Sequence, residues 1–371
     1  EYIEDKILGS AAIILAGLSY GKSSKYLDFG LNSLKKVIKF SLDGQSFPRS
    51  RNLGQLNLHL KYLVLIREWL KESQTDIPEY IDETIYYLGQ SYSLTNQNIK
   101  KGILFNGNNE SNNQDFNMYL SRHGYRFKSD SNEKGGYAVL KNKNISLIMD
   151  VGESPEKKFS NDYQAGALSF EVISDNKKLI SNCGYFSNYQ HQLNRVSKST
   201  ATHSTLIIDN QSSCKLRKKG VSFSNIDQGL KIIKKNVIFE KNYWSIDSSH
   251  DGYLKNYGII HNRQIEFFPE QNKFIGKDNL IKKKNFKSTN FEIRFHLSPG
   301  TKIMKTQDGN SIFIELENEG WKFNCVNYNF DIETGLYFGK KNSYVENQNM
   351  FISGMTQNEN QTIKWVLSKI T

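Results

Sequence analysis

The sequence predicts an α+β protein of two domains, with helices first and a large antiparallel β-sandwich after them. Before about residue 95, apolar residues recur at three- and four-residue spacing, which is typical of amphipathic helices. Beyond residue 115, short runs with two-residue alternation follow one another between turn residues, with no helical pattern between them. A length of 371 residues is sufficient for two separate hydrophobic cores.

The helical domain is expected over residues 1–97. Its apolar stripes lie within residues 7–18, 26–40, 56–70 and 77–88. The links are brief, so successive helices are expected to pack as antiparallel neighbours. Between the second and third stripes lies an irregular polar loop, residues 41–52. A loop held by rigid helices is a favourable position for functional residues.

A linker rich in Asn, Gly and Ser is expected over residues 98–115, and the β-sandwich domain over residues 116–371. The expected strands cover residues 137–140, 145–150, 168–173, 179–182, 204–209, 230–239, 243–247, 259–267, 291–296, 311–316, 321–325 and 362–367. Two lysine-rich stretches, residues 215–219 and 282–284, are expected as solvated turns.

The net charge is +11. An anionic partner fits this balance, either a sulfated or uronate-rich polysaccharide or a nucleic acid. An AT-rich coding sequence explains it equally well, because Lys dominates over Arg, and Asn and Ile are abundant. Charge alone therefore does not decide between a binding role and genome composition.

Several classes of protein are disfavoured by simple counts. The three cysteines, Cys183, Cys214 and Cys325, are an odd and sparse set without metal-ligand spacing. This disfavours a disulfide framework and a zinc knuckle. The longest apolar run near the start, residues 11–18, is too short to span a membrane. No nucleic-acid-binding module is recognisable, so no nucleic-acid partner is expected. The opening at Glu1, without Met or a signal peptide, predicts a fragment whose export signal lies upstream.

One region of the predicted β-domain carries an ordered set of motifs. They are Asp162-Tyr163-Gln164-Ala165-Gly166-Ala167-Leu168-Ser169-Phe170-Glu171, then Leu179-Ile180-Ser181-Asn182-Cys183-Gly184, then Arg195, then Ser199-Thr200-Ala201-Thr202-His203-Ser204-Thr205. Further matches follow at residues 250–253, 261–263, 294–297 and 320–321, and in the helical domain at 43–44 and 48–52. In this order the motifs resemble the bacterial branch of the heparinase II/III-like family of polysaccharide lyases, over nearly the whole chain.

This resemblance implies that the helical domain is an incomplete α/α toroid, with the substrate in a cleft between it and the β-sandwich. The activity it implies is β-elimination at a uronate of an acidic polysaccharide, in the bacterial cell envelope or periplasm. Such chemistry requires the sugar carboxylate to be neutralised, a base for the proton beside it, and an acid for the leaving glycosidic oxygen.

The chain departs from the family pattern where metal-containing members have His, Asp and His ligands. Those positions are Gln164, Asn182 and His203 here. Neutral amides are poor replacements for imidazole and carboxylate, so no bound metal and no cofactor is expected.

The proton-transfer positions also differ. Asp162 stands where the family has a catalytic His, and Leu53 lies near the position of its catalytic Tyr. The family's Asn-His pair is expected near Glu4-Asp5 or upstream, and neither Tyr nor His is present at these places.

His203, Tyr163 and Asp162 are the candidate catalytic residues. His203 can serve as a base or acid, or it can be a core histidine hydrogen-bonded to Gln164 and Asn182. Tyr163 can project beside Asp162 for proton transfer, or it can pack in the core as most aromatic side chains on alternating strands do.

The candidate substrate-binding residues are Arg195, Gln164, Asn182, His250, Tyr253, Arg49 and Asn52. Arg195 can hold a carboxylate or sulfate with two hydrogen bonds, or form a salt bridge across the sandwich. His250 and Tyr253 flank a tight turn and fit either binding or packing. Arg49 and Asn52 can form a polar rim that meets an acidic sugar, or a solvated loop.

Two functions follow from the sequence. The first is a lyase that acts on an acidic polysaccharide, and the second is a catalytically inactive glycan-binding or envelope-assembly protein on the same scaffold. Hydrolysis by an acidic pair that includes Asp162 is a weaker third, because no second carboxylate is clearly placed. The sequence specifies neither the polysaccharide nor an oligomeric state.

Overall fold

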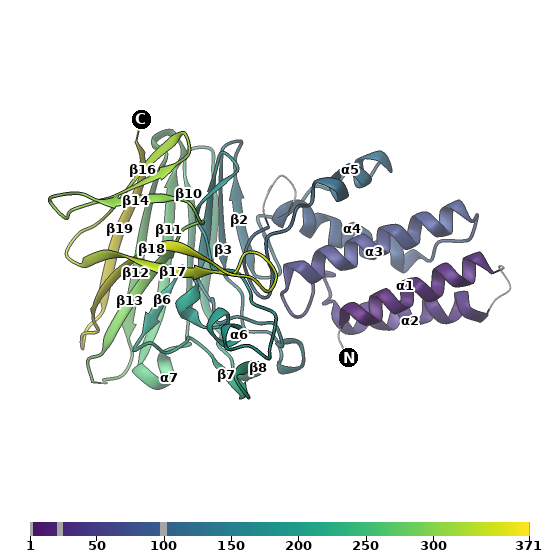
Figure 1. The fold of residues 1–371 in the computed structure, drawn as a ribbon, viewed down its shortest axis with the longest axis horizontal. Helices are drawn as coiled ribbons and strands as arrows, with labels where there is room; N and C mark the ends of the chain where they lie inside the picture. The colour runs from purple at the N-terminus through teal and green to yellow at the C-terminus, as the bar shows by residue number, and fades with distance from the viewer. Residues whose placement is uncertain (1–2, 21–24, 97–101, 286, 371) are drawn as a thin grey trace. The chain divides into compact units, whose positions relative to one another are not determined.

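The computed structural model describes residues 3–20, 25–96, 102–285 and 287–370 (Figure 1). The chain forms two compact units, one of Glu1–Lys100 and Asn112–Gly135 and one of Lys101–Ser111 and Gly136–Thr371. The first unit is helical and the second consists mainly of antiparallel strands. The predicted fold class, helices followed by a large antiparallel β-sandwich, is therefore confirmed, and the toroid stays a prediction.

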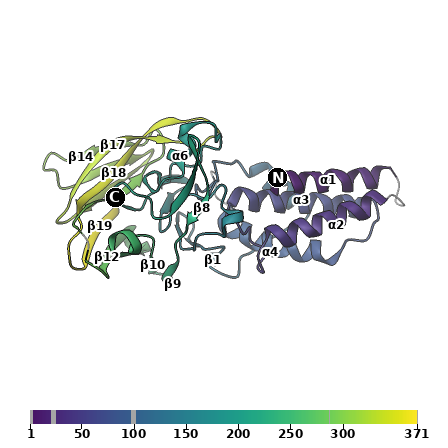
Figure 2. The same cartoon turned by 90° about the horizontal axis from the view of Figure 1, so that it is seen from below.

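The helical unit packs as the apolar stripes predict. Its described helices are α1 (Ile3–Ser19), α2 (Lys25–Ser41), α3 (Leu53–Glu72), α4 (Glu79–Thr95) and α5 (Gln114–Arg122). The axes of α1 to α4 lie side by side (Figure 2), and α1 packs against both α2 and α3. Gly17 permits a close approach, since a Cβ there would lie 2.6 Å from the backbone nitrogen of Leu27 on α2.

The boundary between the units differs from the expected linker. Residues 98–101 lie outside the described residues, residues 102–111 belong to the β unit, and α5 belongs to the helical unit. The amide of Asn109 donates to the carbonyls of Tyr185 and Phe338 at 2.7 and 2.8 Å. Asn-rich composition is typical of loops because Asn bonds to backbone groups, and here those bonds tie the segment to the β unit.

The β unit contains three larger sheets and a hairpin. The strands are β1 (Glu133–Lys134, within the helical unit's residues), β2 (Tyr137–Lys141), β3 (Ile145–Asp150), β4 (Phe170–Ser174), β5 (Lys177–Ile180), β6 (Leu206–Ile208), β7 (Lys215–Lys219), β8 (Ser222–Gln228), β9 (Ile232–Phe239), β10 (Trp244–His250), β11 (Ile259–Phe268), β12 (Lys273–Lys282), β13 (Asn290–His296), β14 (Lys302–Lys305), β15 (Ile312–Leu316), β16 (Glu319–Cys325), β17 (Asn329–Tyr337), β18 (Val345–Met355) and β19 (Gln361–Ile370). One sheet has the order β14-β15-β16-β19-β12-β11-β10-β9. The strands β2-β3-β4-β5 and β17-β18-β13-β6 form two others, and β7 pairs with β8.

The sandwich core lies between the eight-stranded sheet and the two others. Trp365 on β19 stacks on Phe170 of β4 at 5.6 Å and meets Phe295 of β13 edge-on at 5.0 Å. An isolated bridge between Ser181 and His296 joins the end of β5 to β13. The β2–β5 and β6-containing sheets therefore face the same side of the eight-stranded sheet.

Several strands, among them β12 and β7, were not expected from the sequence. On β12, Asp278 is fully buried and Gly276 lies under the ring of Trp365, where a Cβ would be 1.9 Å from a ring atom. A buried carboxylate and a glycine interrupt the apolar alternation by which strands are recognised. Residues 215–219 form the exposed strand β7 and not a turn. None of the described helices is long and apolar enough to cross a membrane.

Candidate functional site

The ordered motifs converge on one part of the β unit. The loop before β4, the turn after β5, the short helix α6 (Gln192–Ser197) and the 3-10 turn η2 (Thr200–Thr202) lie against one another. The backbone of Ala165 donates to the carbonyl of Lys198 at 3.0 Å, and that of Cys183 to Thr202 at 3.0 Å. These bonds hold together segments that are far apart in the sequence.

Gln164 is a completely buried cross-link between backbone segments. Its Oε1 accepts a hydrogen bond from the backbone of Gly107 at 2.9 Å. Its Nε2 donates to the carbonyl of Gly184 at 3.0 Å and to that of Ser197. Both ends of the amide are therefore used, and the 0% exposed Gln164 does not reach a substrate.

His203 and Asn182 are also buried, each with one polar atom that has no partner. His203 Nδ1 donates to the carbonyl of Ser199 at 2.9 Å, so its Nε2 carries a free lone pair, and that atom has no hydrogen-bond partner. Burial lowers the pKa of His203 to about 4, which keeps the ring neutral. Asn182 Oδ1 accepts from the backbone of Ser204 at 2.9 Å, whereas its Nδ2 has no partner.

Of the two alternatives for His203, the core histidine bonded to Gln164 and Asn182 is not observed in that form, because its hydrogen-bond partners are Ser199 and Thr202. The two amides instead bond to backbone groups, as described above. These three side chains do not fit a metal ion either, because only His203 offers an unused donor atom and zinc requires about four ligands. Among the described residues, no group of His, Cys, Asp or Glu is arranged to hold a metal.

Asp162 is the accessible member of the motif region. It is partly exposed, and its Oδ1 accepts hydrogen bonds from Tyr185 Oη at 3.0 Å and Asn161 Nδ2 at 3.3 Å. Its Oδ2 accepts no hydrogen bond from any described residue. Asn194 Nδ2 lies 3.4 Å from Tyr185 Oη and orients the phenol. The arrangement fixes one carboxylate oxygen and leaves the other open to a ligand.

Lys198 is close enough to Asp162 for their charges to interact, and it is almost completely buried. Its Nζ donates to the carbonyls of Asn161 and Phe223, the latter at 3.1 Å. Burial lowers the pKa of Lys198 to about 8, and the charge of Asp162 opposes that decrease. The ammonium also lies over the ring of Tyr185, 5.9 Å from its centre.

Arg195 is exposed on α6, and its guanidinium lies over the ring of Phe223 at 5.4 Å. It forms no salt bridge with a described residue, so the alternative of a bridge across the sandwich is not observed there. Phe223 links the two cations, because its ring lies under Arg195 and its backbone carbonyl accepts from Lys198, whose charge interacts with Asp162.

Tyr163 points into the protein. It is 1% exposed and packs in a small core with Leu216 and Ile226 of the β7–β8 hairpin, and Ser154 Oγ donates to its hydroxyl at 3.3 Å. Of the two alternatives for Tyr163, packing in the core describes its observed position, because its ring does not reach solvent.

His250 and Tyr253 are likewise buried. Tyr253 Oη donates to the carbonyl of Leu206 at 2.9 Å. His250 begins a buried chain of hydrogen bonds: it accepts from the backbone of Gly252 at 3.0 Å and its Nε2 lies 3.3 Å from His261 Nδ1. Neither side chain is available to a substrate.

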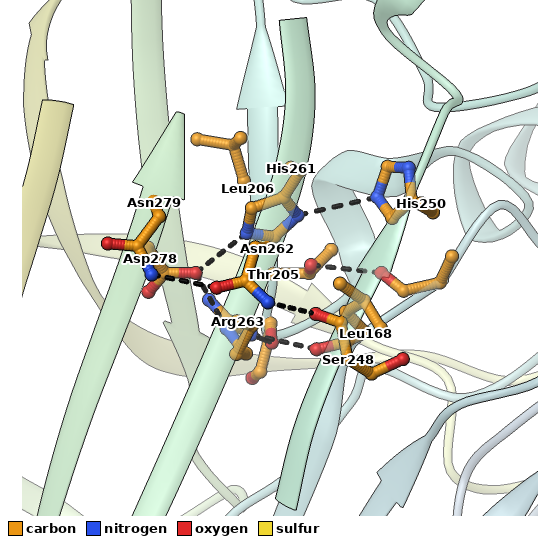
Figure 3. Close-up of polar contacts among 12 residues, drawn as sticks. Leu168, Thr205, Leu206, Ser248, His250, His261, Asn262, Arg263, Asp278 and Asn279 are labelled. Carbon is orange, nitrogen blue, oxygen red and sulfur yellow. Dashed lines mark hydrogen bonds and ion pairs between the residues drawn. The ribbon is translucent and has the colours of Figure 1, made fainter. Parts of the chain in front are cut away.

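The chain of hydrogen bonds continues into the centre of the sandwich (Figure 3). His261 Nε2 donates to Asp278 Oδ1 at 2.8 Å, and Arg263 Nε donates to the same oxygen at 2.7 Å. Arg263 Nη1 donates to the carbonyls of Leu168 and Ser204 at 2.9 and 2.7 Å. All three ionisable side chains are 0% exposed, so this group, the buried Asp278 network, cannot meet a substrate.

In the helical unit, Asn52 caps α3, because its Oδ1 accepts from the backbone of Gly54 and Gln55 at 2.8 and 3.2 Å. Arg49 Nε donates to the carbonyl of Leu42 at 2.8 Å and is half-buried. Leu53, near the expected catalytic tyrosine position, is 0% exposed. Asn52 therefore has a structural role that accounts for its side chain.

Two residues that interact with Asp162 were not identified from the sequence. Tyr185 and Lys198 lie outside the strands and follow no periodic pattern, so only their contacts with Asp162 identify them. The single available signal was proximity, since Lys198 is three residues after Arg195 and one turn of helix brings such residues together.

The helical unit, the antiparallel sandwich and the motif-bearing loops together define a protein with a polysaccharide-lyase type of fold. The family described as "Heparinase II/III-like, C-terminal" matches residues 126–366, which is more than half of the chain. The chain therefore belongs to the heparinase II/III-like family.

Solved structures and a curated relative agree with this assignment. A mutant of heparan sulfate lyase HepC from Pedobacter heparinus has a TM-score of 0.74 at 13% identity, over 98% of this chain and 59% of that one. A heparinase III structure has a TM-score of 0.75 at 15% identity, with coverages of 98% and 59%. FtsZ-localized protein C from Caulobacter vibrioides is 24% identical over 246 residues, 63% of this chain and 42% of that protein. The chain spans less than two thirds of each of these proteins, and at such identities the structures show the fold alone.

Proposed function

We propose that this chain acts on an acidic, uronate-containing polysaccharide as a lyase, by β-elimination. The observation that carries the proposal is the geometry of Asp162, whose Oδ1 is held by Tyr185 and Asn161 while Oδ2 accepts no hydrogen bond from a described residue. A fixed, partly exposed carboxylate at the family's catalytic His position is suited to accept a proton.

The reaction assigns a role to each group. Asp162 Oδ2 takes the proton from the carbon beside the sugar carboxylate, the electron pair of that bond forms a double bond, and the glycosidic C–O bond breaks. The leaving oxygen takes a proton from water. Arg195 neutralises the sugar carboxylate, which makes the departing proton more acidic. Tyr185 is a positioning residue, because it acts through Asp162.

The test uses the chain with heparin-, alginate- and hyaluronan-type polymers and follows the ultraviolet absorbance of the unsaturated product. We expect Asp162→Asn to abolish the signal and Asp331→Asn, a matched change at an exposed carboxylate of β17, to retain it. Tyr185→Phe is expected to lower kcat and displace its pH profile while KM stays similar. A folded wild-type chain that gives no absorbance with any of these polymers contradicts the lyase proposal.

A second function, a glycan-binding or envelope-assembly protein without turnover, is favoured by Gln164 and Leu53. The amide of Gln164 is saturated by backbone groups, and a buried leucine stands near the catalytic tyrosine position. Glycan binding without product formation, unchanged by a chelator, supports this function. Metal-dependent turnover gained by Gln164→His with Asn182→Asp would instead show that only the metal site had been lost.

The location of the protein in the cell is proposed to be the cell envelope or periplasm. The family resemblance supports it, whereas the name of the Caulobacter relative, FtsZ-localized protein C, states no compartment. A fluorescent fusion of the full-length natural protein, combined with fractionation, checks this. Signal confined to the soluble cytoplasmic fraction contradicts it.

A further inference from the structure

The β7–β8 hairpin carries an unusual concentration of positive charge. Strand β7 is Lys-Leu-Arg-Lys-Lys, and only Leu216 of its five residues is buried. Five residues extend about 16 Å at roughly 3.3 Å each. Exposed cations over that length match an extended ligand better than a single small anion.

The hairpin is anchored, so its charges are held in place. Leu216 and Ile226 pack on Tyr163 in the small core beneath it. The backbone of Ile226 donates to Ser160 Oγ at 2.9 Å, next to the Asp162 loop. A rigid arrangement of charges loses less entropy when it binds than a flexible one does.

Neighbouring elements add two further cations to the same surface. Asn225 Nδ2 donates to the carbonyl of Lys157 at 2.6 Å, which fixes the short η1 turn (Lys157–Phe159) beside β8. Arg195 lies on the ring of Phe223 of β8. We define the basic hairpin surface as Lys157, Arg195, Lys215, Arg217, Lys218 and Lys219.

The negative charge on this surface is insufficient to balance it. Asp227 pairs with Lys215 at 2.9 Å, and its pKa is lowered first by that hydrogen bond and also by Arg217 and Lys157. The remaining cations have no acidic partner within salt-bridge distance among the described residues. Like charges held close together repel, and a bound polyanion relieves that repulsion.

We propose that the basic hairpin surface binds a polyanionic polysaccharide, with its carboxylates or sulfates along β7 and one of them held by Arg195. A guanidinium that lies over an aromatic ring can present paired N–H donors that match the two oxygens of such groups. This proposal rests on the substrate class given under the proposed function, and it adds the surface on which that polysaccharide binds. Binding here does not require that elimination occurs, so the two proposals fail separately.

The experiment measures the affinity of the chain for heparin, rich in sulfate, and for alginate, which has only carboxylates. Arg217→Glu with Lys219→Glu is compared with Lys322→Glu with Lys364→Glu, which makes the same charge change on strands β16 and β19 of the eight-stranded sheet. We expect the hairpin variant to bind at least about tenfold more weakly, because surface charge contacts contribute about 1 kcal/mol each, and the control to bind like the wild type. The salt dependence of binding is expected to become shallower in the hairpin variant only.

The outcomes separate the alternatives. Equal losses in both variants would show that net charge alone drives binding and would overturn the proposal, as would unchanged affinity in the hairpin variant. Wild-type binding to anionic vesicles or duplex DNA without binding to either polysaccharide also overturns it. If the double Glu variant does not fold by circular dichroism, Arg217→Gln with Lys219→Gln replaces it, with the same direction of change expected. Loss of affinity together with intact elimination of short substrates locates the surface outside the reacting centre.

Discussion

Two groups of ionisable side chains in the β unit contrast in their access to solvent. The buried Asp278 network joins His261 and Arg263 with His250, and all of its members are at most 1% exposed. The Asp162 cluster has an equally ordered set of hydrogen bonds, but its carboxylate is partly exposed and one oxygen accepts no described hydrogen bond.

The difference shows why a cluster of catalytic residue types is not by itself a site. In the Asp278 network, burial lowers the pKa of both histidines, and the carboxylate is balanced by Arg263, whose charge lowers the Asp278 pKa. Every change of protonation there would place an unbalanced charge in the core. Asp162, in contrast, is partly exposed, so a ligand can reach its carboxylate without entering the core.

The largest expected effect is on the buried network. Asp278→Asn keeps the side-chain size but leaves Arg263 without its counter-charge, and breaking such a buried pair costs about 4 kcal/mol. Urea unfolding measures the loss. Asp227→Asn, on the exposed hairpin, is the control and is expected to leave the unfolding midpoint unchanged. A similar small change in both variants would remove the contrast between the two regions.

Acidification is expected to destabilise the chain through its buried histidines. The pKa of His203 is about 4 in the folded state, lowered from 6.5 by burial, so between these values the unfolded state binds more protons. Its contribution is complete above pH 6.5 and is lost as the pH falls to 4, by an amount on the order of 3 kcal/mol. Unfolding free energies across this range should fall less steeply in His203→Gln than in the wild type. Unfolding free energies that change equally with pH in the two proteins would show that His203 does not cause the loss of stability.

Removing the buried cross-link is expected to have a smaller effect. Gln164→Ala leaves the backbone groups of Gly107, Gly184 and Ser197 without their partner and destabilises by about 2 kcal/mol, reduced where water enters. Thermal unfolding measures it, with Gln211→Ala, an exposed position, as the control. Wild-type stability in Gln164→Ala would mean that the amide is not a cross-link.

The smallest expected effect is at Lys198. Lys198→Met removes two hydrogen bonds but also a buried charge, so a net loss of about 1 kcal/mol at neutral pH is expected. The wild-type lysine has a folded pKa of about 8, lowered from 10.5, so its contribution to stability rises as the pH rises between these values. Lys198→Met should lack that rise. A rise that persists in the variant would place the titration elsewhere.

The candidate site could be predicted from the sequence only in part. The motifs that the sequence singled out do lie together, because Asp162, Gln164, Asn182 and His203 are on segments bonded to one another, and their role as a site stays a prediction. Which of these side chains is accessible did not follow from their types, since a histidine or glutamine fits both a core and a cleft. Tyr185 and Lys198 were missed because they lie outside the strands and follow no periodic pattern.

The sequence by itself determined the fold class, since three- and four-residue spacing and two-residue alternation are local signals of amphipathic helices and strands. It also determined the family, through the order of short motifs along the chain. Only the tertiary structure decided that Gln164 is a cross-link, that Asp278 belongs inside β12, and that Asp162 faces solvent. Burial and hydrogen-bond partners come from segments distant in sequence, and no local pattern encodes which of those segments meet.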